Sequence, residues 1–190
     1  MAVITISFNE LQKFVEITKK QLERLLPILG IPTKFSEKFA KDKTSDEITL
    51  EITPNRPDLL SIEGIARLLN AYLYNKTKKY SARKSDYKLF IKESVKEIRP
   101  YVGVTVVKGL TIDEDILVSL MQLQEKLHTT IGRKRKKVAI GIHDLKDIEF
   151  PIKYAGYELK DAPTFVPLDK DKKMPIEKIL REHEKGMAYA

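Results

Sequence analysis

The chain has 190 residues, of which 42% are hydrophobic and 33% charged, as in soluble globular proteins with a highly charged surface. Lysine and arginine exceed aspartate and glutamate by 35 to 27, and the net charge of +8 favours polyanionic partners. The absence of cysteine excludes disulfides and thiolate zinc sites. The sequence has neither a membrane-length apolar run nor a signal-peptide pattern, so we expect a cytoplasmic protein with no membrane partner.

The first thirty residues have the pattern of a short strand followed by two short helices. A strand is predicted over residues 3–6, followed by two helices that begin in capping boxes at Ser7 and Thr18. Pro27 lies inside the second helical pattern, and it removes a helical hydrogen bond. We therefore expect this helix to be distorted or to end early.

A strand with strict alternation follows at residues 48–52. Before it, residues 34–40 are expected to be extended and residues 41–46 to form a polar turn. The strand leads directly into a proline-rich corner.

Two prolines make this corner stiff. Pro54 and Pro57 fix their own φ angles and hold Asn55 and Arg56 between them. Either Pro57 or Asp58 is expected to begin the next helix, and Asp58 can accept hydrogen bonds from the free amides of its first turn. The corner is a candidate structural centre of the chain.

The helix after the corner is amphipathic. Its predicted buried face consists of Ile62, Ile65, Ala66, Leu69 and Leu73. Gly64 costs roughly 1 kcal/mol relative to alanine at this position, so we expect another backbone to pass close to it. Glu63 and Arg67 have the spacing of an ion pair on the opposite face.

A basic segment follows the helix. Five bases and no acid occur within residues 76–84. Such a run is either a solvated linker or a strip that contacts phosphates. In both cases we place a linker over residues 76–86.

The second half begins with two expected strands, at residues 87–91 and 101–107. Thr111 and Glu114 have the spacing of another capping box, and Gly132 is expected to end the helix that follows. The apolar positions of this helix are Ile116, Leu120, Leu123, Leu127 and Ile131.

Five consecutive bases come next, before a strand expected at residues 138–142. They are Arg133, Lys134, Arg135, Lys136 and Lys137. This run is a candidate contact for an RNA phosphate backbone, and the alternative is a solvated turn. Because no aromatic residue interrupts it, base stacking is not indicated.

Acid–base and metal chemistry have few candidates. The three histidines are far apart and share no metal-ligand spacing, so we expect no metal site. His143 and Asp144 form one possible acid–base pair, and the alternative is a hydrogen-bonded turn. There is no glycine-rich phosphate loop and no ATP-site motif. Pro175 is expected to open a last helix over residues 176–182.

Two stretches carry a resemblance to a known family. Residues 53–61, Thr-Pro-Asn-Arg-Pro-Asp-Leu-Leu-Ser, and then residues 63–67 resemble a signature of the N-terminal domain of phenylalanyl-tRNA synthetase beta subunits. Residues 124–145 resemble the start of the editing domain in the archaeal and eukaryotic branch of that family, and similarity continues to residue 190.

The resemblance implies an α+β fold in two parts. A small N-terminal domain of three helices and a short sheet, B1-like, would cover residues 1–75. After the linker at 76–86, an incomplete α+β editing domain, B3/B4-like, would cover residues 87–190. In this comparison Pro54, Asn55, Arg56, Pro57, Asp58 and Gly64 are the signature residues, with a structural role.

The resemblance also implies a function. The parent enzyme is an aminoacyl-tRNA synthetase of two alpha and two beta subunits. Its alpha subunit uses ATP and Mg²⁺ to charge tRNA(Phe), and the beta subunit hydrolyses tyrosine from mischarged tRNA(Phe). This chain itself would bind no cofactor. Two alternatives remain, a stand-alone RNA-binding module and a subunit-interface module, both without catalytic activity.

Overall fold

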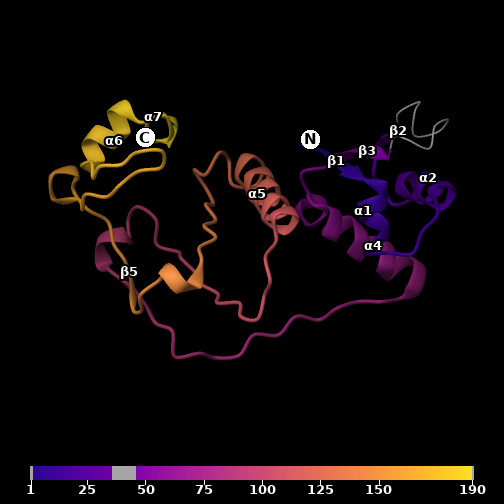
Figure 1. Cartoon of the computed structure of the whole chain (residues 1–190), viewed down its shortest axis with the longest axis horizontal. Coiled ribbons are helices and arrows are strands. Elements are labelled where there is room, and N and C mark those ends of the chain that lie inside the picture. Colours follow the sequence, from indigo (N-terminus) through magenta and orange to yellow (C-terminus); the bar gives the residue numbers. More distant parts are fainter. Residues whose placement is uncertain (1, 36–45, 190) are drawn as a thin grey trace. The chain divides into compact units, whose positions relative to one another are not determined.

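The computed structural model describes residues 2–35 and 46–189 of the chain (Figure 1). Contacts within the chain divide it into two compact units. The first unit comprises residues 1–82 and 111–141, and the second comprises residues 83–110 and 142–190. The chain therefore passes between the units three times.

The first unit contains a three-stranded antiparallel sheet. Its strands are β1 (Ala2–Ser7), β2 (Thr33–Phe35) and β3 (Glu47–Ile52), and β3 lies in the middle. The strands predicted at residues 3–6 and 48–52 are thus confirmed. The expected extended segment is observed up to the end of β2, and the rest of it and nearly all of the polar turn lie outside the described residues.

Three helices accompany this sheet in the first part of the chain: α1 (Phe8–Gln12), α2 (Lys19–Ile28) and α4 (Ile62–Tyr74). The Ser7 side chain accepts a hydrogen bond from the Glu10 amide, and Thr18 forms the predicted capping box with Gln21. Pro27 lies inside α2, and the helix continues past it to Ile28 with Leu29 as the C-cap, so the expected early end at the proline is not observed.

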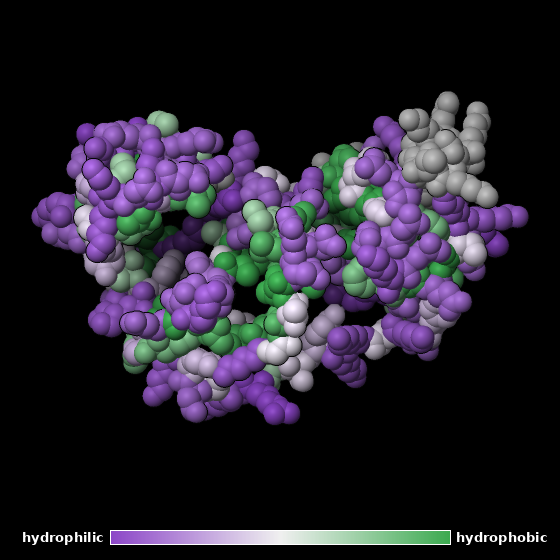
Figure 2. Space-filling model, viewed as in Figure 1, coloured by the Kyte–Doolittle hydropathy of each residue, from purple (hydrophilic) through white to green (hydrophobic). Residues whose placement is uncertain are grey.

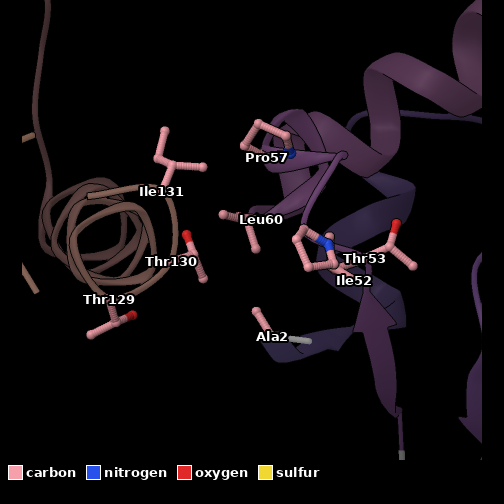
Figure 3. Close-up of a pocket in the computed structure, with 9 residues that line it drawn as sticks. Ala2, Ile52, Thr53, Pro57, Leu60, Thr129, Thr130 and Ile131 are labelled. Atoms are coloured by element: carbon pink, nitrogen blue, oxygen red, sulfur yellow. The ribbon is translucent and has the colours of Figure 1, made fainter. Parts of the chain in front are cut away.

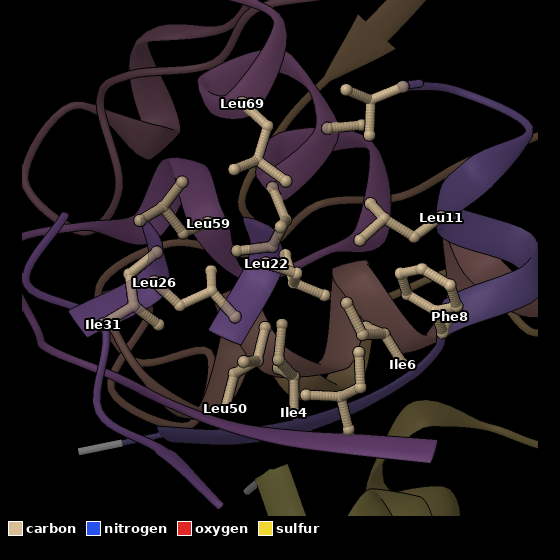
Figure 4. Packing of buried hydrophobic residues seen from close by; sticks show 14 of the residues in the cluster. Ile4, Ile6, Phe8, Leu11, Leu22, Leu26, Ile31, Leu50, Leu59 and Leu69 are labelled. Atoms are coloured by element: carbon tan, nitrogen blue, oxygen red, sulfur yellow. The ribbon is translucent and has the colours of Figure 1, made fainter. Parts of the chain in front are cut away.

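The core of the first unit lies between the sheet and these helices (Figure 4). Ile4 and Ile6 of β1 and Leu50 of β3 point toward Leu22 and Leu26 of α2. The alternation of the strands places their apolar residues on this face, as the sequence predicts. The core is one continuous cluster that extends to Leu69 of α4.

The corner differs from its prediction at two points. Residues 57–59 form a separate 3₁₀ turn, and α4 begins later, with the Ser61 side chain accepting from the Gly64 amide. Asp58 does not cap α4, because its carboxylate accepts two hydrogen bonds from Arg56, at 3.0 and 2.9 Å. This bidentate pair closes the corner on itself.

The close backbone predicted at Gly64 is confirmed. A Cβ atom at this position would lie 2.0 Å from the carbonyl oxygen of Asp58, so only glycine lets the corner pass so close to α4. The predicted pair of Glu63 with Arg67 is wrong. Arg67 donates instead to the Asp58 carbonyl at 3.4 Å, and Glu63 accepts from Ser119 at 2.9 Å.

A fourth helix of the first unit, α5 (Glu114–Thr129), packs against its core. Asp113 caps it in place of the expected Thr111, because the Asp113 carboxylate accepts from the Ile116 amide. Leu123 and Leu127 pack against the core, and Lys126 donates to the Val3 carbonyl of the edge strand β1 at 2.8 Å. Other positions of the predicted stripe, Ile116 and Ile131, are exposed.

The second unit has little regular structure. It contains a parallel pair of short strands, β4 (Leu89–Ile91) and β5 (Ile152–Tyr154), and the helices α6 (Ile176–Glu182) and α7 (Glu184–Tyr189). The helix predicted at residues 176–182 is confirmed with Pro175 preceding it. The strand expected at residues 101–107 is wrong, because this segment pairs with no strand among the described residues.

Hydrophobic atoms reach the surface of the molecule among the hydrophilic ones (Figure 2). In the second unit Tyr101 is 93% exposed and Ile98 is 78% exposed, whereas Val95 and Ile179 are buried. No helix among the described residues is long and apolar enough to cross a membrane.

The predicted mixture of helix and sheet is confirmed. The narrower description, a three-helix domain followed by the start of an editing domain, stays a prediction. The same holds for the division into 1–75, 76–86 and 87–190. The contacts place residues 111–141 in the first unit, which that division did not foresee.

Candidate nucleic-acid interface

The five consecutive bases lie in a tight turn directly after α5. We call residues 133–137 the basic turn. Arg133, Lys134 and Arg135 have φ angles of 47°, 54° and 66°, in the left-handed region that residues with a Cβ atom seldom adopt. This conformation costs roughly 1–2 kcal/mol per residue, so other interactions must hold the turn in place.

Backbone hydrogen bonds fold the basic turn back onto the end of the helix. The Arg135 amide donates to the His128 carbonyl at 3.3 Å, and the Lys137 amide donates to the Gly132 carbonyl at 2.9 Å. Gly132 is buried, and a Cβ atom there would lie 2.6 Å from the Val138 carbonyl oxygen. Glycine is therefore required where the turn closes.

Two side chains of α5 hold the chain that leaves the basic turn. The Ile140 amide donates to Nε2 of His128 at 2.7 Å, and Gln124 donates to the Ile140 carbonyl. Gln124 and His128 are four residues apart and so lie on one helical face. The strand expected at residues 138–142 is wrong for this reason: its central backbone groups pair with side chains instead of with another strand.

His128 carries a second, unusual feature. Because Nε2 accepts the Ile140 amide, the proton of the neutral ring lies on Nδ1. The side chain is 2% exposed, and Nδ1 has no hydrogen-bond partner among the described residues. Such a buried, unsatisfied donor costs roughly 1–3 kcal/mol. The nearest carboxylate oxygen, Oε2 of Glu125, lies 3.8 Å away, beyond hydrogen-bond distance.

The charges of the basic turn divide into two groups. Arg135 is half-buried and pairs with Oε2 of Glu125 at 2.6 Å. The other four bases are exposed, and within the described residues no ion pair involves them. They are Arg133, Lys134, Lys136 and Lys137. Their contact with RNA stays a prediction.

The predicted acid–base pair does not come together. Asp144 accepts from the Lys146 amide at 3.1 Å and pairs with the Lys146 ammonium at 2.7 Å. The latter hydrogen bond lowers the pKa of the Asp144 carboxyl. His143 is exposed, and the described residues contain no hydrogen bond between it and Asp144. The hydrogen bonds of Asp144 to Lys146 agree with the alternative, a hydrogen-bonded turn, and a catalytic role of the two residues stays a prediction.

The proline corner faces the end of α5 across a hollow of about 310 Å³ (Figure 3). Pro57 and Leu60 lie on one side, and Thr130 and Ile131, which directly precede the basic turn, lie on the other. Pro54 also lines the hollow. The signature residues Pro54 and Pro57 and the residues directly before the basic turn thus line one hollow of the first unit.

Sequence analysis did not identify Gln124, Glu125 or His128 as site residues. Their signal was a histidine within an otherwise apolar helical stripe, with polar residues three and four positions before it. Among residues 2–35 and 46–189, no group of three histidine or acidic side chains is placed to hold a metal ion.

Comparison with known proteins relates the whole chain to one group. It is 41% identical over 192 residues to a phenylalanine--tRNA ligase beta subunit of Archaeoglobus fulgidus, and 39% identical over 194 residues to that of Methanocaldococcus jannaschii. These alignments include 100% of this chain and 34% of each relative, so the chain spans about a third of their length. No family model matches the chain.

A solved structure agrees with these relatives. It is an N-terminal fragment of the phenylalanyl-tRNA synthetase beta subunit from Pyrococcus horikoshii, with a TM-score of 0.82 and 32% identity. The superposition covers 99% of this chain and 54% of the fragment.

Proposed function

Because the chain is homologous over its whole length to the N-terminal region of archaeal phenylalanine--tRNA ligase beta subunits, we propose that it performs the role of that region. It contributes to the architecture of the ligase and to the domain that hydrolyses tyrosine from mischarged tRNA(Phe). Its partners are the alpha subunit and tRNA(Phe). Activation of phenylalanine with ATP and Mg²⁺ belongs to the rest of the ligase in this proposal.

The observation that carries an RNA role is the basic turn. Four exposed bases project from a turn whose backbone is fixed by hydrogen bonds to α5. A fixed turn loses little conformational freedom when it binds, so more of each phosphate contact appears as affinity. The basic turn is therefore a better phosphate-binding surface than the equally charged segment at residues 76–84, which has no regular structure.

Hydrolysis of mischarged tRNA answers a physical difficulty of phenylalanine selection. A hydrophobic pocket rejects an analogue that merely adds a hydroxyl group by a modest factor, so a second site that hydrolyses the wrong product raises accuracy. In this chain His143 and Asp144 are the residues that we propose to test for such a role. The engagement of Asp144 with Lys146 favours the alternative, a module that binds RNA or the other subunit without catalysis.

The RNA role is tested by removing the charges of the basic turn. Binding of a tRNA(Phe) transcript is measured as a function of salt concentration for the wild type and for a variant with four substitutions. These are Arg133→Ser, Lys134→Ser, Lys136→Ser and Lys137→Ser. Each lost phosphate contact should lower the slope of log K against log salt by roughly 0.7–0.9.

A matched control removes four bases from the linker instead: Lys76→Ser, Lys78→Ser, Lys79→Ser and Lys84→Ser. It changes the net charge equally and is expected to lower the slope less. Equal losses in both variants would mean that net charge alone attracts the tRNA. Hydrolysis of Tyr-tRNA(Phe) by the chain, and its loss in His143→Ala, would separate an editing role from the non-catalytic alternative.

A further inference from the structure

One oxygen atom of Glu125 lies between two donors. Its Oε2 accepts from the Arg135 guanidinium at 2.6 Å and lies 3.8 Å from the protonated Nδ1 of His128. Arg135 therefore pairs with the carboxylate, and Nδ1 of the buried imidazole has no hydrogen-bond partner among the described residues. Both donors thus lie near the same carboxylate oxygen.

We propose that Glu125 exchanges these partners when a phosphate group of RNA binds the basic turn. Arg135 leaves Glu125 and donates to the phosphate, and the Glu125 carboxylate then accepts a hydrogen bond from Nδ1 of His128. The inference rests on the proposed RNA role and adds a fifth phosphate contact to the four exposed bases. No covalent bond changes, and no proton is transferred.

The first argument for the exchange is that it leaves no group unpaired. A phosphate oxygen is a good acceptor for the planar guanidinium of Arg135, which it binds through two parallel hydrogen bonds. The carboxylate that Arg135 gives up meets a buried donor that lacks a partner. A bound phosphate thus replaces one ion pair with two hydrogen-bonded groups, the Arg135 guanidinium and Nδ1 of His128.

The second argument is that the movement is small. Oε2 must approach Nδ1 by roughly 1 Å to reach hydrogen-bond distance. Glu125 has room for this shift because its side chain is 53% exposed, and it lies three residues before His128 on the same helical face. The hydrogen bonds of Gln124 and His128 to Ile140 do not involve Nδ1, so the basic turn keeps its backbone conformation.

The charge of the surroundings selects the ligand. A carboxylate ligand would also attract Arg135, but the bases on both sides of it in the basic turn favour a ligand with regularly repeated negative charges. The phosphodiester backbone of RNA has this property. The exchange therefore recruits Arg135 when several phosphates occupy the turn together.

The test compares Arg135→Ser with Lys13→Ser in salt-dependent binding of a tRNA(Phe) transcript. Lys13 is a matched control, since it belongs to the same unit and pairs with Glu10 at 2.6 Å. If Arg135 is recruited, Arg135→Ser lowers the log–log slope by roughly 0.7–0.9, and Lys13→Ser leaves it unchanged. If Arg135 stays with Glu125, neither substitution changes the slope, and the exchange is refuted.

A second variant reports on Glu125 directly. Glu125→Gln removes the charge that holds Arg135 but keeps an oxygen that can accept from His128. Binding should tighten by roughly 1.5- to 5-fold, which is the range expected for loss of a partly exposed competing ion pair. Arg135→Ser in the Glu125→Gln background should abolish that gain. Thermal melts establish that both variants are folded.

A spectroscopic measurement distinguishes the exchange from a purely structural role of Arg135. The Nδ1–H signal of His128 should move downfield when tRNA(Phe) is added, because the proton then enters a hydrogen bond. An unchanged signal despite binding refutes the exchange and leaves the proposed RNA role intact. If the wild type shows no salt-dependent binding at all, the proposed RNA role itself fails.

Discussion

The two units solve the problem of burying apolar residues in different ways. The first unit encloses one continuous cluster that runs from Ile4 to Leu69 (Figure 4). In the described part of the second unit, Val95, Pro167 and Ile179 are the buried apolar side chains, and large side chains such as Tyr101 remain exposed. Burial of apolar area stabilises a fold by about 25 cal/mol per Å², so the first unit has far more of this stabilisation.

The second unit has polar and backbone contacts where the first unit has an apolar core. His183 is buried, its Nε2 is hydrogen-bonded to the Leu168 carbonyl at 2.8 Å, and its Nδ1 accepts from the Lys185 amide. Both ring nitrogens are satisfied, in contrast to His128 of the first unit. Segments with few buried apolar contacts open at a lower free energy than a packed core does. We therefore expect the two units to respond differently to the same substitution.

The largest difference is expected for a leucine in each unit. Leu69 is fully buried in the first unit, so Leu69→Ala leaves a cavity and should reduce the free energy of unfolding by roughly 2–5 kcal/mol. Leu168 is 68% exposed in the second unit, and Leu168→Ala should change it by less than about 0.5 kcal/mol. Urea unfolding followed by far-UV circular dichroism measures both. Similar losses would mean that the second unit has a core as well packed as the first.

A pair of glycines should give the next largest difference. Gly64→Ala places a Cβ atom 2.0 Å from the backbone oxygen of Asp58, and the strain should cost roughly 1–3 kcal/mol even though alanine favours the helix. At Gly103 of the second unit, a Cβ atom would meet nothing within 4 Å. Gly103→Ala should therefore be neutral within about 0.5 kcal/mol. A stabilised Gly64→Ala protein would show that the corner moves freely away from α4.

The same contrast explains what sequence reasoning found. β3, the Thr18 capping box and the close backbone at Gly64 are encoded by neighbouring residues, so local patterns predicted them. Their partners lie in the first unit, where packing follows the pattern of apolar residues. The family resemblance also depends on contiguous residues, and the relatives support it.

The errors concern segments whose partners are distant side chains. Residues 138–142 have the apolar composition of a strand, but Ile140 pairs with Gln124 and His128, and no pattern of backbone periodicity predicts this. The exposure of the basic turn was predicted from its charge, whereas the retention of Arg135 by Glu125 was not. An ion pair between residues ten apart becomes visible only once the left-handed turn is known.

The smallest expected difference concerns two carboxylates that each pair with a base two residues away. In the first unit the Arg56 guanidinium hydrogen-bonds Asp58 and lowers the pKa of that carboxyl, and in the second unit Lys146 does the same to Asp144. A lowered pKa in the folded state means that the stabilising contribution is complete above the unfolded value, near 3.9, and is lost as the pH falls through the folded value.

Asp58→Asn should therefore destabilise the protein at pH 7 by less than about 1 kcal/mol, because the Asp58 side chain is 45% exposed and the pair is screened by solvent. The difference between Asp58→Asn and the wild type should shrink as the pH is lowered from about 5 toward 2, where the wild-type carboxyl also becomes neutral. Asp144→Asn should have a smaller effect, since its partner is a flexible lysine that makes no bidentate contact. Thermal melts across this pH range measure both variants. A loss for Asp58→Asn that stays constant down to pH 2 would show that the shape of the aspartate side chain, and not its charge, holds the corner.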